Sequence, residues 1–255
     1  MGDFMEKYFD VNKAGHSVRC KLYYAKDLRA LNSIVIATHG FGGSKENKGF
    51  AKFAEKITAK YKGYGVLCFD WPCHGADARK KFDIDECLLY IDLVIDYIKN
   101  ELKIADIYNY STSLGGYLTL RYLKIKGNPF KKIALRCPAL KLFETMSKNL
   151  TAEDKQKLNK GKEVMIGFER KMKIDKNFME NLRLGDVMQY EYFDFADDII
   201  ILHGTKDTTV PIENSIAFAE ANVIELVPVE NADHPFTNPK CMDIAIHRII
   251  TFFND

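Results

Sequence analysis

The chain of 255 residues lacks several features that mark other classes of protein. No run approaches 18 consecutive apolar residues, which argues against a membrane span. The first seven residues hold no apolar segment of a secretory signal, and Glu6 stands where N-myristoylation needs serine or threonine. The six cysteines include no C-x-x-C pair and several lie in apolar runs, so we expect reduced core cysteines and a cytoplasmic protein.

Motifs for metals and nucleotides are missing too. There is no H-E-x-x-H and no paired cysteine cluster, so we expect no metal and no cofactor. The glycine-rich stretch from His39 to Ser44 has Lys45 where a dinucleotide fingerprint needs its third glycine, and it lacks P-loop spacing. The 37 basic and 35 acidic residues form no basic stripe with interleaved aromatics. The composition therefore argues against a nucleic-acid partner.

Short apolar runs alternate with helical patterns along most of the chain. A hydrophobic content of 47% is ample for a sizeable core. We expect an antiparallel hairpin over 8–24 and then strands over 33–38, 65–70, 105–110, 132–137, 198–202 and 223–227. Helical patterns lie between or after them at 48–61, 83–102, 117–125, 212–221 and 242–253. The alternation predicts an α/β fold with a mostly parallel sheet and helices on both faces.

One interval interrupts this alternation. Residues 139–191 show helical patterns, five methionines and many lysines, but no convincing central strand. We interpret them as a short helical cap insertion over the carboxyl edge of the sheet, where ligands bind in open α/β folds. A side layer with only a packing role is the alternative. The predicted organisation is a core of 1–138 and 192–255 with a cap of 139–191.

Ser113 lies where an expected strand meets an expected helix. A serine on such a sharp turn holds its hydroxyl clear of the backbone, and small neighbours such as Gly115 and Gly116 let strand and helix approach closely. The helix also points free N–H groups at any anion formed there. We interpret the turn as a nucleophile elbow, although Ser111 replaces the first glycine of the G-x-S-x-G pattern. An ordinary β-to-α turn is the alternative.

A serine nucleophile needs a neighbouring base. His234 lies in a turn-rich loop between the last expected strand and the last expected helix, at the same sheet edge as Ser113. His74, in a loop after a strand, is the main competitor; a Cys73–His74 dyad is disfavoured because adjacent loop residues rarely face each other. The other four histidines fit hairpin, tight-turn or helix positions: His16, His39, His203 and His247.

The base in turn needs an orienting acid. Asp207 follows the penultimate strand, in a loop that ends at the helix-starting Pro211. A helix-cap or turn role is the alternative for this residue. Asp233 is less suited, because it is the immediate neighbour of His234.

An acyl-transfer site also needs two backbone donors aimed at the developing oxyanion. Leu114, directly after the serine, supplies one N–H. Phe41 is our choice for the second, because Gly40 and Gly42 let the backbone approach closely. We expect some of the aromatic residues Phe41, Trp71 and Tyr190 to line the substrate pocket.

With these residues placed, the chain resembles the α/β-hydrolase superfamily over nearly its full length, and most of all the compact esterases of the cinnamoyl/feruloyl type. The order serine, aspartate, histidine is that of the fold. The matching stretches are His39 to Gly43, Asp70 to Gly75, Ser113 to Gly116, His203 to Asp207 with Val210-Pro211, and Asp233-His234. The resemblance implies a nucleophile, an acid and a base at Ser113, Asp207 and His234, with N–H donors at Phe41 and Leu114.

We therefore predict a serine hydrolase that cleaves small carboxylic esters through an acyl-enzyme intermediate. A thioesterase or small-amide or peptide hydrolase on the same triad stays open, as does a ligand-binding protein without turnover. Apart from the substrate, we expect no nucleic acid and no membrane span, and a homodimer stays open. Ser111 and Thr112 replace the glycine and histidine usual in the family, which leaves the triad intact but bears on packing beneath the oxyanion site.

Overall fold

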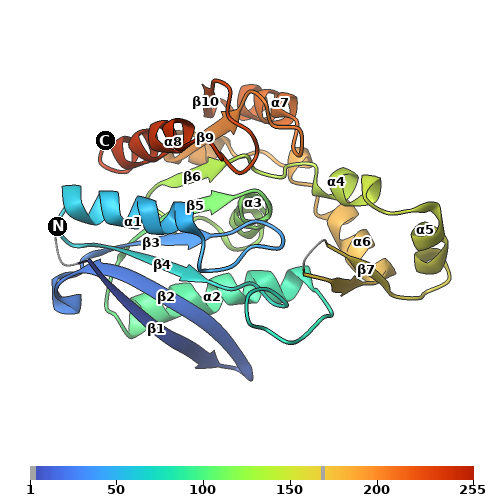
Figure 1. Ribbon diagram of the computed structural model, residues 1–255, viewed down its shortest axis with the longest axis horizontal. Helices are drawn as coiled ribbons and strands as arrows, with labels where there is room; N and C mark the ends of the chain where they lie inside the picture. Colours follow the sequence, from blue (N-terminus) through green and yellow to red (C-terminus); the bar gives the residue numbers. More distant parts are fainter. Residues whose placement is uncertain (1–3, 168–169) are drawn as a thin grey trace.

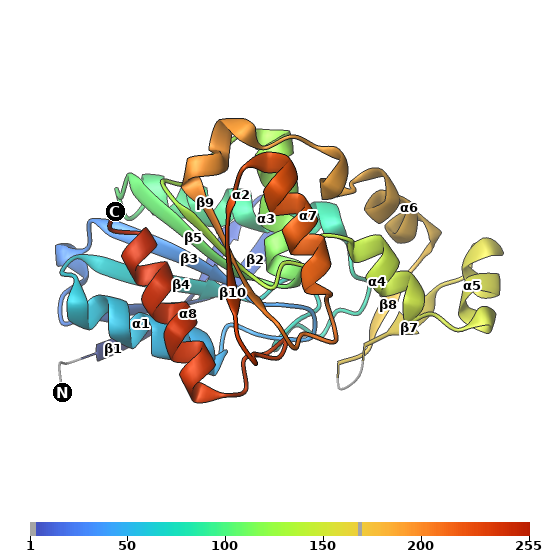
Figure 2. The same ribbon diagram turned by 90° about the horizontal axis from the view of Figure 1, so that it is seen from above.

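The computed structural model describes residues 4–167 and 170–255. In these ranges an eight-stranded sheet has the order β1-β2-β4-β3-β5-β6-β9-β10, and helices cover both of its faces (Figures 1 and 2). β1 pairs antiparallel with β2 and β2 with β4, whereas the other neighbouring pairs are parallel. The predicted α/β fold with a mostly parallel sheet is confirmed.

The strands lie close to their predicted positions. Their bounds are β1 Phe4–Lys13, β2 His16–Ala25, β3 Ser33–Thr38, β4 Tyr64–Phe69, β5 Asp106–Thr112, β6 Ile133–Arg136, β9 Ile199–Gly204 and β10 Glu225–Val229. β10 begins two residues later than predicted, because Val223 ends the preceding helix in a left-handed conformation with φ of 58°.

Two helical layers enclose the sheet. α1 Lys48–Lys60 and α8 Pro239–Phe252 cover one face, and α2 Ile84–Asn100, α3 Leu114–Lys126 and α7 Ile212–Asn222 cover the other (Figure 2). Short 3-10 turns occur at η1 Leu28–Ala30, η2 Val187–Gln189 and η3 Phe193–Asp198. The first helices begin where side chains accept backbone N–H bonds: Asn47 caps α1 and Asp83 caps α2.

The core forms two apolar clusters, one on each side of the sheet. Every residue of β3 is buried, and alternate residues point to opposite faces: Ile34 and Ile36 join one cluster, Val35 and Ala37 the other. All six cysteines fall in the described ranges, and each is a buried free thiol. Across those ranges, no helix combines the length and apolar character needed to cross a membrane.

The predicted insertion joins β6 to β9, which are neighbours in the sheet. It contains α4 Leu142–Lys148, α5 Ala152–Asn159, β7 Val164–Ile166, β8 Met172–Ile174 and α6 Lys176–Leu184. These elements extend beyond the carboxyl ends of the parallel strands, at the right of both views. β7 and β8 form a separate antiparallel pair that the sequence analysis did not foresee, because three residues are too few to show a strand pattern.

Candidate active site

Ser113 lies at the turn from β5 into α3, with φ of 51° and ψ of −113°. A positive φ is uncommon for serine, and surrounding contacts hold it. A Cβ added at Gly115 would lie 2.4 Å from Thr38 Oγ1, and one at Gly116 would lie 2.8 Å from Pro138 Cβ. Small residues are therefore required where α3 begins, as the predicted elbow needs.

The unexpected Ser111 is part of a buried polar cluster beneath this turn. Its hydroxyl donates to Asn109 Oδ1 at 2.6 Å and accepts from Thr38 Oγ1 at 2.7 Å, and it lies 2.8 Å from Thr119 Oγ1. The cluster links β3, β5 and α3 under Ser113. The buried hydroxyl therefore has the hydrogen-bond partners it needs.

Three predicted residues come together at the carboxyl edge of the sheet. His234, in the loop between β10 and α8, has Nε2 3.0 Å from Ser113 Oγ and Nδ1 2.6 Å from Asp207 Oδ2. The carboxylate only accepts, so Nδ1–H donates to it and Nε2 is left to accept from the serine hydroxyl. The arrangement can deprotonate a serine that attacks a carbonyl group.

Asp207 lies between two histidines. His203 Nε2 is 3.3 Å from Asp207 Oδ2 and 3.0 Å from Val210 O, and its Nδ1 is 2.8 Å from Ser215 Oγ. Burial raises the pKa of the Asp207 carboxyl, but hydrogen bonds from His203, His234 and Val210 N–H outweigh it and hold the pKa well below its usual range. The sequence suggested only a turn-bracing role for His203; its contact with the acid was missed.

The competing histidine, His74, is buried away from Ser113. Its Nδ1 lies 2.8 Å from Pro72 O, and it does not line the cavity at Ser113. Its neighbour His39 has Nδ1 2.8 Å from Gly40 O, as predicted for a residue that braces a turn. Burial and the adjacent His74 lower the pKa of His39 to about 3, so this ring is neutral.

Phe41 and Leu114 offer two backbone donors beside the serine. A Cβ on Gly40 would lie 3.0 Å from Ser113 Cβ, so the glycine-rich loop packs directly against the elbow. Leu114 is the first residue of α3, where the helix supplies no acceptor for its N–H. Neither N–H meets an acceptor among residues 4–167 and 170–255, and both residues line the cavity at Ser113.

Ser113 opens into a cavity of about 570 Å³. Core loops form one wall, and the insertion forms the other with residues such as Leu142, Met146 and Ile166. A cavity of this size suits a small organic ligand, for which pockets of roughly 300–1,000 Å³ are usual. The lining is mainly apolar, with two cationic side chains, Arg136 and Lys171.

Two aromatic residues predicted to line the pocket lie elsewhere, and that prediction is corrected. Trp71 is 1% exposed and donates its indole N–H to His39 O at 2.9 Å, so it supports the glycine-rich loop from within the core. Tyr190 follows η2 and packs against Lys124, whose Nζ lies 5.3 Å from the ring centre. Of the three, only Phe41 lines the cavity. The sequence places aromatic residues near a loop but does not tell which way they point.

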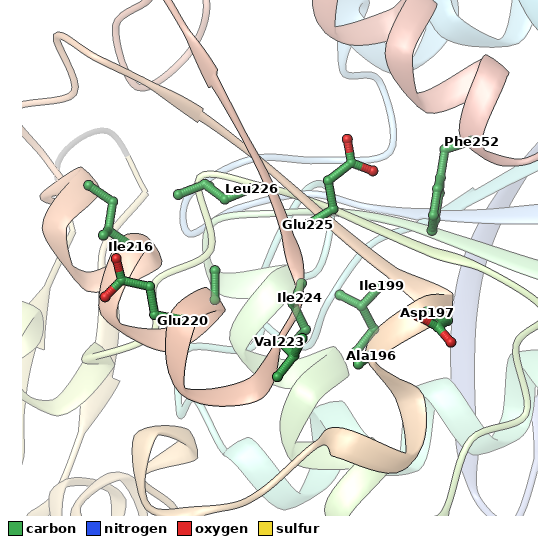
Figure 3. Close-up of a pocket in the computed structure, with 11 residues that line it drawn as sticks. Ala196, Asp197, Ile199, Ile216, Glu220, Val223, Ile224, Glu225, Leu226 and Phe252 are labelled. Carbon is green, nitrogen blue, oxygen red and sulfur yellow. The ribbon is translucent and has the colours of Figure 1, made fainter.

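A larger hollow, of about 660 Å³, opens at the β10 edge of the sheet (Figure 3). Apolar residues such as Val223 and Ile224 line it together with the carboxylates of Glu220 and Glu225. Among the described residues that form its wall there is no serine, cysteine or histidine. The chemical groups, and not the volume, therefore single out the smaller cavity as the candidate active site.

One set of atoms in the described parts of the chain has metal-ligand spacing. Cys137 Sγ, an Asp207 oxygen and a His234 ring nitrogen lie within 4.8 Å of one another. Burial raises the pKa of the Cys137 thiol to about 12, so the sulfur is protonated and a poor metal ligand. The aspartate and histidine are already hydrogen-bonded to each other. We assign the aspartate and histidine atoms to the Ser113 hydrogen-bond chain, and the absence of a metal stays a prediction.

Residues 33–171, more than half of the chain, match the family model of the alpha/beta hydrolase fold. The chain belongs to the α/β-hydrolase family. The family resemblance stated from the sequence motifs is thereby confirmed. A search of curated proteins finds no match.

Solved structures share the fold over almost the whole chain. Est1E from Butyrivibrio proteoclasticus with bound ferulic acid is 20% identical, with a TM-score of 0.78 over 97% of this chain and 100% of that chain. Alpha/beta hydrolase domain-containing protein 10 from mouse is 16% identical, with a TM-score of 0.73 over 97% and 98%. A monoacylglycerol lipase from Paleococcus ferrophilus is 19% identical, with a TM-score of 0.66 over 93% and 98%. The likeness to Est1E agrees with the resemblance to feruloyl-type esterases at the level of fold.

Proposed function

We propose that the protein is a serine hydrolase that cleaves small carboxylic esters through an acyl-enzyme intermediate. The observation that carries the proposal is the hydrogen-bonded chain from Asp207 through His234 to Ser113, which ends in a cavity large enough for a small ester. The serine at this point is held in the strained conformation of an elbow. Family membership supports the proposal without choosing a substrate.

In the acylation step, Ser113 Oγ attacks the ester carbonyl carbon while His234 Nε2 takes the hydroxyl proton. Asp207 keeps the imidazole in the required tautomer and stabilises the imidazolium that forms. The N–H groups of Phe41 and Leu114 donate to the oxyanion, and a donor in that role contributes about 3–4 kcal/mol of transition-state stabilisation. The tetrahedral intermediate then collapses, and His234 gives the proton to the departing alcohol.

Deacylation repeats the same proton transfers with water as the nucleophile. His234 removes a proton from water as its oxygen attacks the acyl carbon, and the carboxylic acid leaves as the Ser113 oxygen regains the proton. In this proposal, residues 139–191 act as the cap of the pocket, and the protein works in the cytoplasm. The low pKa of Asp207 supports an anionic acid throughout the cycle.

Three alternatives use the same fold. A thioesterase or amidase would share every step, because the machinery serves acyl transfer in general. An aminopeptidase would need a carboxylate to anchor a free amine, and no aspartate or glutamate is among the described residues that line the cavity. A ligand-binding protein without turnover was suggested by the altered elbow, but the satisfied hydrogen bonds of Ser111 weaken that argument.

The proposal is tested with 4-nitrophenyl esters of increasing acyl length, the matching thioesters and aminoacyl 4-nitroanilides. We expect saturable ester hydrolysis that Ser113→Ala abolishes and the exposed control Ser17→Ala retains. Wild-type protein that hydrolyses none of the esters, or a Ser113→Ala variant with unchanged rates, would refute it. Faster turnover of thioesters than of esters would instead favour the thioesterase alternative.

A further inference from the structure

Arg136 is a buried cation in the wall of the candidate active site. It ends β6 next to the elbow, where its carbonyl oxygen accepts the Ser113 N–H at 3.1 Å, and it is only 5% exposed. Its Nη1 donates to His234 O at 3.3 Å, and its guanidinium carbon lies 4.9 Å from the centre of the Phe236 ring. The side chain therefore touches the loop that carries the proposed base.

No carboxylate neutralises this guanidinium. Within the described parts of the chain, Arg136 forms no ion pair with an aspartate or glutamate, and its Nε meets no hydrogen-bond acceptor. Removing an unpaired charge from water is strongly unfavourable unless a partner of opposite charge compensates. A carbonyl oxygen, a ring face and the neighbouring Tyr110 hydroxyl are neutral groups and compensate the charge only weakly. An anion in the cavity that Arg136 lines would complete its interactions.

A second cation faces the same cavity from the insertion. Lys171 is exposed, lines the cavity and forms no ion pair with any residue that the structure describes. Among the described residues that line the cavity, the lysine and arginine side chains are thus Arg136 on the core side and Lys171 on the insertion side, and no aspartate or glutamate faces them. The hollow at β10 has the opposite character, with Asp197, Glu220 and Glu225 in its wall. Like charges along a mainly apolar cavity concentrate ligands of the opposite charge.

We infer that the preferred substrate is an ester that carries a carboxylate, such as the half-ester of a dicarboxylic acid. Arg136 and Lys171 hold the carboxylate while the ester carbonyl lies at Ser113. A guanidinium fork matches the two oxygens of a carboxylate, and the flexible lysine adds a second charge. This inference rests on the proposed ester hydrolysis and narrows it to one charge class.

The test compares two substrates that differ in one charge: 4-nitrophenyl hydrogen adipate and its neutral methyl ester. For wild-type protein we expect kcat/KM to be roughly ten- to hundredfold higher for the anionic ester, the range expected for hydrogen bonds to a charged group. The ratio of the two kcat/KM values should fall towards one in Arg136→Met and recover in part in Arg136→Lys. Spontaneous hydrolysis is subtracted with Ser113→Ala.

Lys171→Met supplies a test that does not depend on the buried core. Lys171→Met should lower the ratio of the two kcat/KM values several-fold, and added salt should lower it as well. Lys162 is an exposed lysine of the insertion outside the cavity, so Lys162→Met should leave the ratio unchanged. If Arg136→Met fails to fold, the ratios of the two kcat/KM values in Lys171→Met and Arg136→Lys test the inference.

A wild-type ratio at or below one overturns the inference, as does a high ratio that neither Lys171→Met nor Arg136→Lys lowers. In both cases hydrolysis of the neutral ester would leave the proposed function standing. Failure to hydrolyse either ester, together with an unreactive Ser113, would contradict both the inference and the proposed function.

Discussion

The core loops and the insertion form opposite walls of one cavity, but they contribute different chemistry. Ser113, Asp207 and His234 follow β5, β9 and β10, so each proposed chemical group stands at the carboxyl end of a sheet strand. The insertion contributes mainly apolar side chains and one lysine. In the proposed function, the reacting groups all come from the core, whereas the substrate pocket is shaped by the insertion together with Arg136 of the core.

The two walls are also held in place by different contacts. The elbow is fixed by close packing of Gly115 and Gly116 and by the buried cluster of Ser111. The insertion is joined to the core by apolar residues such as Phe178 and Leu182, which belong to the same buried cluster as α2 and α3, and by hydrogen bonds such as Tyr117 O–H to Gly185 O at 3.0 Å. A rigid wall suits chemistry that depends on geometry, and a wall with adaptable methionine side chains suits variation in ligand shape.

The largest expected effect on activity comes from Asp207→Asn, a substitution on the core side of the cavity. Asparagine cannot hold the imidazole in the required tautomer, so we expect kcat to fall about 10⁴-fold for every substrate. Initial rates with a short and a long ester measure this. Asp233→Asn is the matched control, because the Asp233 side chain bonds to Thr237 and not to His234. Comparable losses in the two variants would contradict the assignment of the acid.

Paired glycine substitutions compare the rigidity of the two regions. Gly115→Ala places a Cβ 2.4 Å from Thr38 Oγ1 and 2.9 Å from Thr38 O, so the start of α3 must shift. We expect a loss of about 1–3 kcal/mol in the free energy of unfolding, with a loss of activity. Gly161→Ala in the insertion meets no atom within 4 Å, and its φ of 72° should cost only about 1 kcal/mol. Urea unfolding measures the loss of unfolding free energy in each variant. Equal losses and equal activities in the two variants would argue against a rigid core site.

Acid should destabilise the core loop that carries Phe41. Burial lowers the pKa of His39 to about 3, below the unfolded value near 6.5, so the unfolded chain binds more protons between these pH values. The contribution of His39 is present above about pH 6.5 and is lost as the pH falls. We expect unfolding free energy to drop by about 2 kcal/mol between pH 7 and pH 5 from this residue. Urea titrations at both pH values should show a smaller drop in unfolding free energy for His39→Gln than for the wild-type protein. An identical drop would show that His39 does not cause the acid destabilisation.

The smallest effect should come from the insertion wall. Met146 is buried and lines the cavity, so Met146→Ala enlarges the space for substrate. We expect kcat/KM for long acyl esters to rise several-fold relative to 4-nitrophenyl acetate, since one methylene in an apolar pocket changes selectivity by about 1–3 kcal/mol. A panel of chromogenic esters measures the ratio. An equal change in kcat/KM for all esters would contradict the claim that Met146 affects the choice of acyl chain rather than the reaction itself.

The comparison of core and insertion also shows how much of the fold and of the candidate site could be predicted from the sequence. The convergence of Ser113, Asp207 and His234 could be predicted because each follows an apolar run that predicts a strand, and parallel strands present their carboxyl ends at one edge. The position of Phe41 beside the cavity could be predicted because it lies in a glycine-rich loop after a strand. The insertion was predicted as an interval without a central strand, although β7 and β8 were too short to detect, and its bounds of 139–191 stay a prediction.

Side-chain direction was beyond prediction. Trp71 turns into the core, and Tyr190 packs on Lys124 outside the cavity, yet both lie in stretches that reach the right region of the fold. The contact between His203 and Asp207 depends on the three-dimensional path of the loop, which composition does not encode. The hydrogen-bonded role of Ser111 likewise depends on partners far away in the chain.

The central claim is that Ser113 is a nucleophile activated by His234. Labelling with a fluorophosphonate, followed by intact-mass measurement and peptide mapping, tests it most directly. The account predicts a single adduct on Ser113 in the wild-type protein, none in Ser113→Ala, and strongly slowed labelling in His234→Ala. An unlabelled wild-type protein, or an adduct on another residue that persists in Ser113→Ala, would contradict it.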